Sequence, residues 1–359
     1  MLEFSSDLWT NKEITDATDQ QLNGTINYAI GGASGKVLSS TLEFAGYSVP
    51  DQYFVYAPDG KVSAGDGVLG LGPAQDSRIR SLRNTSAANP PIDRIFSSDN
   101  STDNYIAVLL GRGDEISSSD APGDASTAAS SPKYPGDLSI CSVLPKYASV
   151  RNQPKLDVTQ VPRRLINGQH WQVLLDSDGI KGTDGQRIEI SSRVDGAGKD
   201  QPATVIFDTG YTFPQVPDDV AEALYKNVPG AKLEYVAPSA GNAWSLPCDA
   251  ELSASFFFGG IEYPIHPLDL NFQAEDGTCF GGFQPYTVDP AKVDGGIVGY
   301  DMILGMAFLR NAYMLVDFGS YTDVGNTPDE GASFIQLLPL TNATEATDEF
   351  RPDVFGAAV

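Results

Sequence analysis

One short segment of the sequence carries the residue types that carboxylate chemistry needs. An apolar run at 205–207 leads directly into Asp208, Thr209, Gly210, Tyr211 and Thr212. An aspartate at the end of a buried strand is costly to desolvate unless hydrogen bonds hold it, and a neighbouring hydroxyl and turn amides can supply those bonds. The pattern predicts a rigidly held carboxylate at Asp208. An aspartate that only caps a turn has the same tripeptide, so the surrounding chain has to decide between the two interpretations.

The charge of the chain excludes several classes of function. Its 359 residues include 47 acidic and 23 basic side chains, which give a formal net charge of −24. Binding to nucleic acid or to anionic membranes depends on clustered Lys and Arg, and a surface this acidic repels phosphate. No apolar run approaches the roughly 18 to 20 residues that cross a bilayer. We therefore expect a globular protein without nucleic-acid or membrane partners, whose acidity serves either solubility or work in an acid medium.

Histidine and cysteine are too sparse for most metal sites. The two histidines, His170 and His266, disfavour imidazole-based schemes, and we assign neither a catalytic role. The three cysteines, Cys141, Cys248 and Cys279, allow at most one disulfide, and no spacing among them suggests zinc. We interpret Cys141 as a buried small apolar residue.

Short apolar or alternating stretches separated by Gly, Pro, Asn and Asp indicate an all-β protein with long loops. The clearest stretches are 24–30, 37–44, 52–56, 105–110, 169–175, 204–207, 255–258 and 313–318. One helix is predicted over 217–225, where carboxylates begin it and Pro229 follows its end. The strings 67–72 and 302–305 both end in apolar residues and glycine, which suits close backbone approach and hints at a duplicated fold.

Four glycosylation sequons would suit a secretory route, although such triplets also arise by chance. They begin at Asn23, Asn84, Asn100 and Asn342. The opening residues 1–9 lack the basic segment, apolar run and cleavage site of a signal peptide. Either a signal has been removed or the beginning of the protein is missing.

Over most of its length the chain resembles the pepsin-like aspartic endopeptidases, in particular the secreted or vacuolar fungal type. Six segments match in order: a flap-like hairpin at 26–35, the stretch 66–71, the strand around Trp171, the signature Asp208-Thr209-Gly210, the pair Cys248 and Cys279, and the closing stretch 303–318.

The resemblance implies an all-β fold of two lobes with the active-site cleft between them. The N-terminal lobe would span 1–163, be incomplete and include the flap, and the C-terminal lobe would span 164–359 and carry the signature. Cys248 and Cys279 would form the disulfide of the second lobe. The expected active-site turn is Asp208, Thr209, Gly210 and Thr212, and the expected flap and substrate-binding residues are Tyr28, Ala29, Ile30 and Tyr211.

The mechanism implied by the resemblance needs two aspartates, one from each lobe, that share a proton. The ionised member draws a proton from water while the protonated member hydrogen-bonds the scissile carbonyl, so no cofactor and no metal are required. The resemblance implies a monomer that cleaves polypeptide substrates at acid pH and has a secreted or vacuolar location.

The sequence departs from this family at the first signature, Asp-Thr-Gly-Ser-Ser. Residues 5–9 match the second part of this signature, but Leu2, Glu3 and Phe4 stand where Asp, Thr and Gly are expected. The chain as given is therefore expected to have little or no activity, through truncation or true loss. The alternatives are a catalytically dead peptide- or protein-binding homologue, such as an inhibitor, or a homodimer pairing two copies of Asp208, which the second lobe would obstruct.

Overall fold

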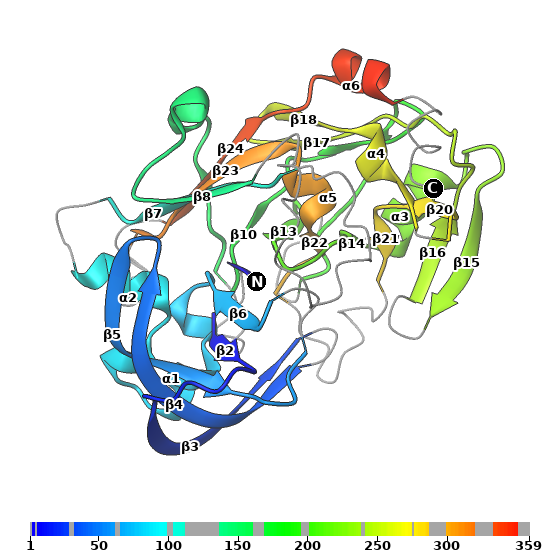
Figure 1. Cartoon of the computed structure of the whole chain (residues 1–359). Coiled ribbons are helices and arrows are strands. Elements are labelled where there is room, and N and C mark those ends of the chain that lie inside the picture. The colour runs from blue at the N-terminus through cyan, green and yellow to red at the C-terminus, as the bar shows by residue number, and fades with distance from the viewer. Residues whose placement is uncertain are drawn as a thin grey trace.

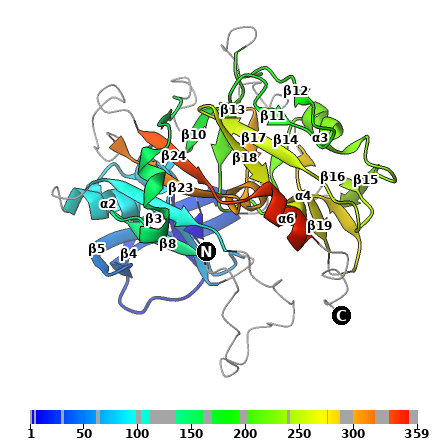
Figure 2. The same ribbon diagram turned by 90° about the horizontal axis from the view of Figure 1, so that it is seen from above.

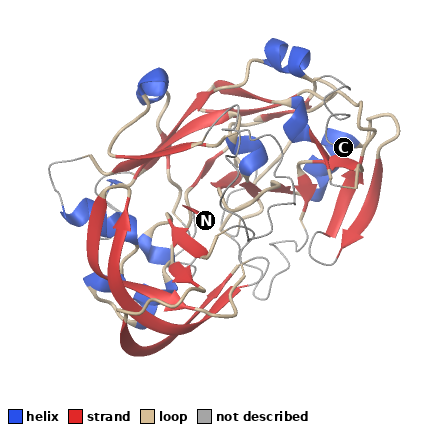
Figure 3. Ribbon diagram, viewed as in Figure 1, coloured by secondary structure: helices blue, strands red, loops and turns tan. Residues whose placement is uncertain are grey.

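The computed structural model describes most of the chain (Figure 1). The described residues are 2–3, 6–28, 32–61, 65–98, 103–111, 136–160, 169–194, 201–237, 241–274, 276–286, 299–319 and 333–350. Strands dominate these segments and the helices are short (Figure 3). The all-β prediction is confirmed.

The first part of the sequence forms a six-stranded sheet, drawn in blue in Figure 1. Its spatial order is β1-β6-β2-β5-β4-β3, with β1 parallel to β6 and β2 parallel to β5. The side chains of β3 and β4 largely alternate between buried or partly buried and exposed positions, as expected for strands with one face on a core. The strands are β1 (Leu2–Glu3), β2 (Leu8–Thr10), β3 (Thr18–Asn27), β4 (Gly32–Phe44), β5 (Tyr47–Tyr56) and β6 (Gly67–Gly70).

Three sheets come from the second part of the sequence. The sheet that carries Asp208 has the order β10-β13-β22-β14-β21, and its strands are β10 (Gln172–Leu174), β13 (Thr204–Phe207), β14 (Gln215–Val216), β21 (Gln284–Pro285) and β22 (Met302–Leu304). A second sheet, β12-β11-β17-β18, contains β11 (Ile180–Lys181), β12 (Arg187–Ile188), β17 (Ala254–Phe258) and β18 (Ile261–Ile265). The third, β15-β16-β20-β19, contains β15 (Lys232–Ala237), β16 (Gly241–Ser245), β19 (Asn271–Gln273) and β20 (Cys279–Gly281).

A fifth sheet joins both parts of the sequence. Its order is β8-β7-β23-β24-β9, so strands before and after the predicted lobe boundary are hydrogen-bonded to one another. In Figure 2 β23 and β24 lie between the blue strands and the yellow and green strands. The strands are β7 (Tyr105–Leu109), β8 (Asp137–Ile140), β9 (Leu156–Asp157), β23 (Ala312–Asp317) and β24 (Phe334–Pro339). The predicted boundary at 163 falls outside the described residues and stays a prediction.

Short helices cover the sheets. The predicted helix at 217–225 is confirmed as α3 (Asp218–Tyr225), which buries its apolar side. The sequence prediction missed the other helices, because most are too short for a clear 3.6-residue period. They are α1 (Arg78–Leu82), α2 (Pro91–Ser98), α4 (Pro267–Leu270), α5 (Met306–Leu309), α6 (Ala343–Glu349), and the 3-10 helices η1 (Ala74–Asp76), η2 (Ser86–Ala88) and η3 (Pro145–Asn152).

The largest apolar core runs through both parts of the chain. It includes Leu71 and Phe96 from the first part together with Trp171, Phe207 and Phe318 from the second. Phe318 packs edge-on against both Phe96 and Trp171, with ring centroids 5.0 and 4.6 Å apart. Aromatic contacts of this kind add to the apolar area that is buried, so this core holds the two parts together around the site.

Candidate active site

Asp208 lies directly after the buried strand β13, as the sequence predicts. The strand is hydrogen-bonded on both sides, antiparallel to β10 and parallel to β22. The amide of Asp208 donates to Leu304 O at 3.0 Å, and its Oδ1 accepts a bond of 2.8 Å from the amide of Gly210. The strand and the turn therefore fix both the backbone and one carboxylate oxygen, which is the geometry expected of a preorganised acid.

The turn after Asp208 packs closely against the end of β22. The amide of Met306 donates to Tyr211 O at 2.6 Å, and that of Ala307 donates to Thr212 O at 3.3 Å. A Cβ at Gly305 would lie 2.2 Å from Tyr211 O, closer than real contacts allow, so this position requires glycine. The close backbone approach predicted for the string 302–305 is thus present, and it holds Tyr211 and Thr212 beside Asp208 through backbone bonds.

The hairpin of β3 and β4 presents the predicted flap tyrosine. The strands pair as far as Asn27 with Gly32, and Ala29 and Ile30 lie outside the described residues. Tyr28 is partly buried, and its hydroxyl accepts a hydrogen bond of 2.8 Å from Trp9 Nε1. Trp9 itself is 1% exposed. The tyrosine at the described end of this hairpin is therefore tied to a core residue of β2.

Two residues near Asp208 were not predicted as site residues. The amide of Phe207 donates to Trp171 O, which places His170, the residue before Trp171, across the sheet from Asp208. The His170 ring meets the Tyr300 ring edge-on at 6.1 Å between centroids. Burial, and next the charge of Asp208, raise the pKa of the Tyr300 phenol. The signal in the sequence was the position of His170 immediately before Trp171.

His170 is held neutral over most of the pH range. Desolvation, with the positive charge of Arg78 adding to it, lowers the pKa of the imidazole from 6.5 to about 4. Arg78 belongs to α1 of the first part of the chain, so residues of both parts act on the surroundings of His170. Above about pH 4 the uncharged imidazole therefore adds no positive charge beside the carboxylate site.

A hydrogen bond connects the two parts of the chain next to the signature strand. Trp171 Nε1 donates to Leu71 O at 2.9 Å, and Trp171 is fully buried. Leu71 follows β6, and Trp171 is bonded to Phe207 at the end of β13. The ends of β6 and β13 are therefore joined through a single side chain.

The first part of the chain holds buried carboxyl groups at Asp7 and Asp93. Asp7 accepts hydrogen bonds from Ser77 Oγ at 2.8 Å and from the amides of Arg78 and Ile79, yet burial raises its pKa. Burial also raises the pKa of Asp93 to about 8, and neither of its carboxyl oxygens has a hydrogen-bond partner among the described residues. Such groups are neutral in acid and become costly as the pH rises.

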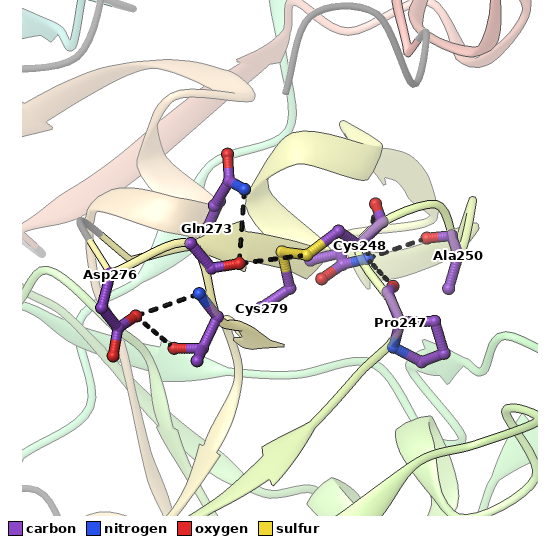
Figure 4. Close-up of a disulfide and its surroundings, with 9 residues drawn as sticks. Pro247, Cys248, Ala250, Gln273, Asp276 and Cys279 are labelled. Atoms are coloured by element: carbon purple, nitrogen blue, oxygen red, sulfur yellow. Dashed lines mark hydrogen bonds between the residues drawn. A yellow bond between two sulfur atoms is a disulfide. The ribbon is translucent and has the colours of Figure 1, made fainter. Parts of the chain in front are cut away.

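The predicted disulfide is present. Cys248 and Cys279 are joined across a separation of 31 residues, where the bond links the chain after β16 to β20 (Figure 4). Asn271 donates its side-chain amide to Pro247 O at 2.9 Å, which fixes the segment beside the disulfide. The interpretation of Cys141 as buried is wrong. It is a free residue with φ of 55° that follows β8 in a bend, where it packs against the core but stays partly exposed.

The remaining predicted sites are placed only in part. Asn23, Asn84 and Asn342 are exposed, whereas Asn100 lies outside the described residues. Asn342 Oδ1 accepts the amide of Thr344 and caps α6. No group of His, Cys, Asp and Glu in the described segments could hold a metal ion. None of the helices in these segments is long and apolar enough to cross a membrane.

Comparisons with known proteins agree with this geometry. The probable aspartic-type endopeptidase CTSD of Arthroderma benhamiae is 25% identical over 306 residues, covering 82% of this chain and 47% of that protein. Major aspartyl peptidase 1 of Cryptococcus neoformans var. grubii is 28% identical over 147 residues, 40% of this chain and 27% of that protein. The chain thus spans about half, or less, of these relatives.

The fold has a close counterpart among solved structures. The aspartic proteinase from Irpex lacteus superposes with a TM-score of 0.65 at 17% identity, over 96% of this chain and 91% of that one. The likeness shows the bilobal all-β fold of that enzyme class. The family model described as eukaryotic aspartyl protease matches residues 5–325, so this chain belongs to the eukaryotic aspartyl protease family.

Proposed function

We propose that this protein is an acid endopeptidase in which Asp208 is one of two carboxyl groups that activate water, and that it cuts polypeptides between apolar residues. The observation that carries the proposal is the position of Asp208 at the end of β13, with Oδ1 held by the Gly210 amide. Thr209, 9% exposed, and Thr212 complete the turn, while Tyr28, Ala29, Ile30 and Tyr211 are the proposed flap and cleft residues.

The reaction is a direct attack of water on the scissile carbonyl carbon. One carboxylate takes a proton from the water, and the other, protonated carboxyl donates a hydrogen bond to the carbonyl oxygen. The tetrahedral intermediate then breaks its C–N bond as the nitrogen receives a proton, which yields a carboxylic acid and an amine. Two carboxyl groups are needed because a lone aspartate of pKa about 3.9 cannot serve as base and acid at once.

We further propose little or no activity for the chain as given, because the residues that match the first signature lack an aspartate. Leu2, Glu3 and Phe4 stand in place of Asp-Thr-Gly. Restoring the tripeptide by the triple substitution Leu2→Asp, Glu3→Thr, Phe4→Gly should produce hydrolysis of an acid-denatured protein at pH 3 to 5. The additional change Asp208→Asn should abolish it. An inactive but folded triple variant would contradict the proposed function.

A secreted or vacuolar glycoprotein that works as a monomer is the proposed setting. The exposed sequon residues Asn23, Asn84 and Asn342 are open to glycosylation. Expression through a yeast secretory route should add mass that an endoglycosidase removes, and light scattering should give the mass of one chain. Unchanged mass after endoglycosidase, or a dimer in solution, would count against these points.

A peptide-binding homologue without catalysis is the second candidate, and the changed residues 2–4 favour it. It predicts that the chain as given binds apolar peptides and leaves them intact. Calorimetric titration with a peptide that the triple variant cleaves distinguishes the two, since a pseudoprotease would bind that peptide in the native chain with micromolar or better affinity.

A further inference from the structure

The two signature strands pair with their neighbours in different registers. In the second part of the chain, Phe207 pairs with Leu304, and Asp208 is the next residue. On the other side of β22, Gln215 pairs with Ile303. These pairings define the position of the catalytic acid relative to the strand that ends in two apolar residues and a glycine.

The first part of the chain repeats this arrangement with one residue fewer. Its string Val68-Leu69-Gly70 corresponds to Ile303-Leu304-Gly305. Trp9 pairs with Val68 as Gln215 pairs with Ile303. Leu2, however, pairs with Leu69 and Glu3 with Gly70, so Leu2 has the register position of Phe207. Glu3, and not Leu2, therefore has the register position of Asp208.

The connecting segments account for the shift. Residues 209–214 separate Asp208 from Gln215, whereas the shorter run 4–8 separates Glu3 from Trp9. Counting back from Trp9 with the family spacing gives Leu2, because that count assumes a connection as long as 209–214. The parallel pairing of β1 with β6 instead places Glu3 at this position, because it sets the register of β1 directly against the neighbouring strand.

Backbone and side-chain contacts also bring the end of β1 near the end of β13. Glu3 pairs with Gly70, and the next residue, Leu71, accepts the bond from Trp171 Nε1. Trp171 O in turn accepts the amide of Phe207, which precedes Asp208. The backbone positions of residues 3 and 208 are thus linked through two adjacent ladders and one side chain.

We infer that residue 3 is the position of the second catalytic carboxyl group, so that Glu3 takes the place of the aspartate that the family signature supplies. This inference rests on the proposed function and assigns its missing acid. A glutamate carboxyl can share a proton as an aspartate does, but it stands one methylene, about 1.5 Å, farther from the backbone. Since catalytic groups must be held to within about 0.5 Å, Glu3 gives a poor rate and aspartate at residue 3 gives a better one.

Single substitutions in the full 359-residue chain test the assignment, because Leu2 and Glu3 are neighbours on an edge strand. Glu3→Asp should raise the rate of acid hydrolysis at least tenfold above the chain as given, and Asp208→Asn added to it should remove the gain. Glu3→Gln should lower any residual rate to that of Asp208→Asn alone. Leu2→Asp alone should not reproduce this gain, and the control Asp59→Asn, in an exposed turn outside the site, should leave the rate unchanged. Thermal unfolding of each variant checks that it is folded.

The outcomes separate this inference from the function on which it rests. A gain with Leu2→Asp but not with Glu3→Asp would overturn the inference and still support the proposed function. Equal rates for both variants and the parent chain would overturn it as well. The triple variant remains active under the proposed function in either case, because an aspartate at residue 2 leaves residues 3–8 before Trp9, a connection as long as 209–214. An inactive triple variant contradicts the function itself.

Discussion

Trp9 Nε1 donates a hydrogen bond of 2.8 Å to the hydroxyl of Tyr28, joining the core of the first sheet to the described end of the β3–β4 hairpin. Trp9 is buried, while Tyr28 is only partly so. A buried indole N–H without a partner costs about 1 to 3 kcal/mol. The bond therefore fixes the orientation of Tyr28 relative to β2, and the hairpin end is coupled to the core.

Removing this hydroxyl should impair both stability and activity. Tyr28→Phe is expected to lower the free energy of unfolding by about 1 kcal/mol, because the Trp9 N–H loses its hydrogen-bond acceptor. In the triple variant with Asp-Thr-Gly at residues 2–4, we expect kcat/KM to fall about tenfold, since the proposed flap tyrosine loses its orientation. Denaturant unfolding and peptide kinetics measure both effects. Tyr235→Phe is the control, because Tyr235 is 66% exposed.

Asp93 should make the protein less stable as the pH rises from about 4 to about 8. Its pKa is raised to about 8 in the folded chain, while an unfolded aspartate titrates near 3.8. Between these values the folded state holds a proton that the unfolded state has lost, so stability falls by up to about 1.4 kcal/mol per pH unit. Below about pH 4 both states are protonated and Asp93 has no such effect.

The Asp93→Asn variant tests this sign. It should equal the parent chain in stability at pH 3 and exceed it by about 2 to 5 kcal/mol at pH 8, because a neutral amide replaces a buried group that must ionise. Urea unfolding at several pH values measures the difference. Asp59→Asn, in an exposed turn, should leave the pH profile unchanged. A parallel shift of the Asp93→Asn curve at all pH values would argue against titration as the cause.

His170, in contrast to Asp93, should make the protein less stable as the pH falls. Its pKa of about 4 lies below the ordinary 6.5, so the unfolded chain gains a proton between these values before the folded chain does. The stability contributed by neutral His170 is therefore complete above about pH 6.5 and decreases as the pH falls toward 4. His170→Phe keeps an aromatic ring against Tyr300. The change in Tm that it causes, relative to the parent chain, should be more positive at pH 4 than at pH 8. Equal Tm changes at the two pH values would refute this.

The disulfide should contribute about 3 to 4 kcal/mol, since it closes a loop of 31 residues in the unfolded chain. The double variant Cys248→Ser, Cys279→Ser should lose this amount in denaturant unfolding under oxidising conditions. Cys141→Ser should lose little, because Cys141 is a free and partly exposed residue. A reducing agent should bring the parent chain down to the double variant and leave the latter unaffected.

The sequence by itself determined the class of the protein and the identity of one acid. Alternation in the apolar stretches and the Gly and Pro between them specify strands, and these are local properties that neighbouring residues impose. The segment 205–210 specifies an acid at a strand end for the same reason. The equally short helices α2 and α3 had different outcomes: α3 was predicted because carboxylates begin it and Pro229 follows its end, whereas no such pair of signals was read for α2.

Only the tertiary structure decided which residues surround that acid. His170 and Tyr300 meet near Asp208 although 130 positions separate them in the chain. Asp93 is fully buried, which the sequence of its own helix α2 does not indicate. The register of β1 is the clearest case. Spacing from Trp9 gives Leu2, whereas the parallel ladder with Leu69 and Gly70 gives Glu3. A strand's register is set by the partner that satisfies its backbone hydrogen bonds, and that partner lies more than sixty residues away along the chain.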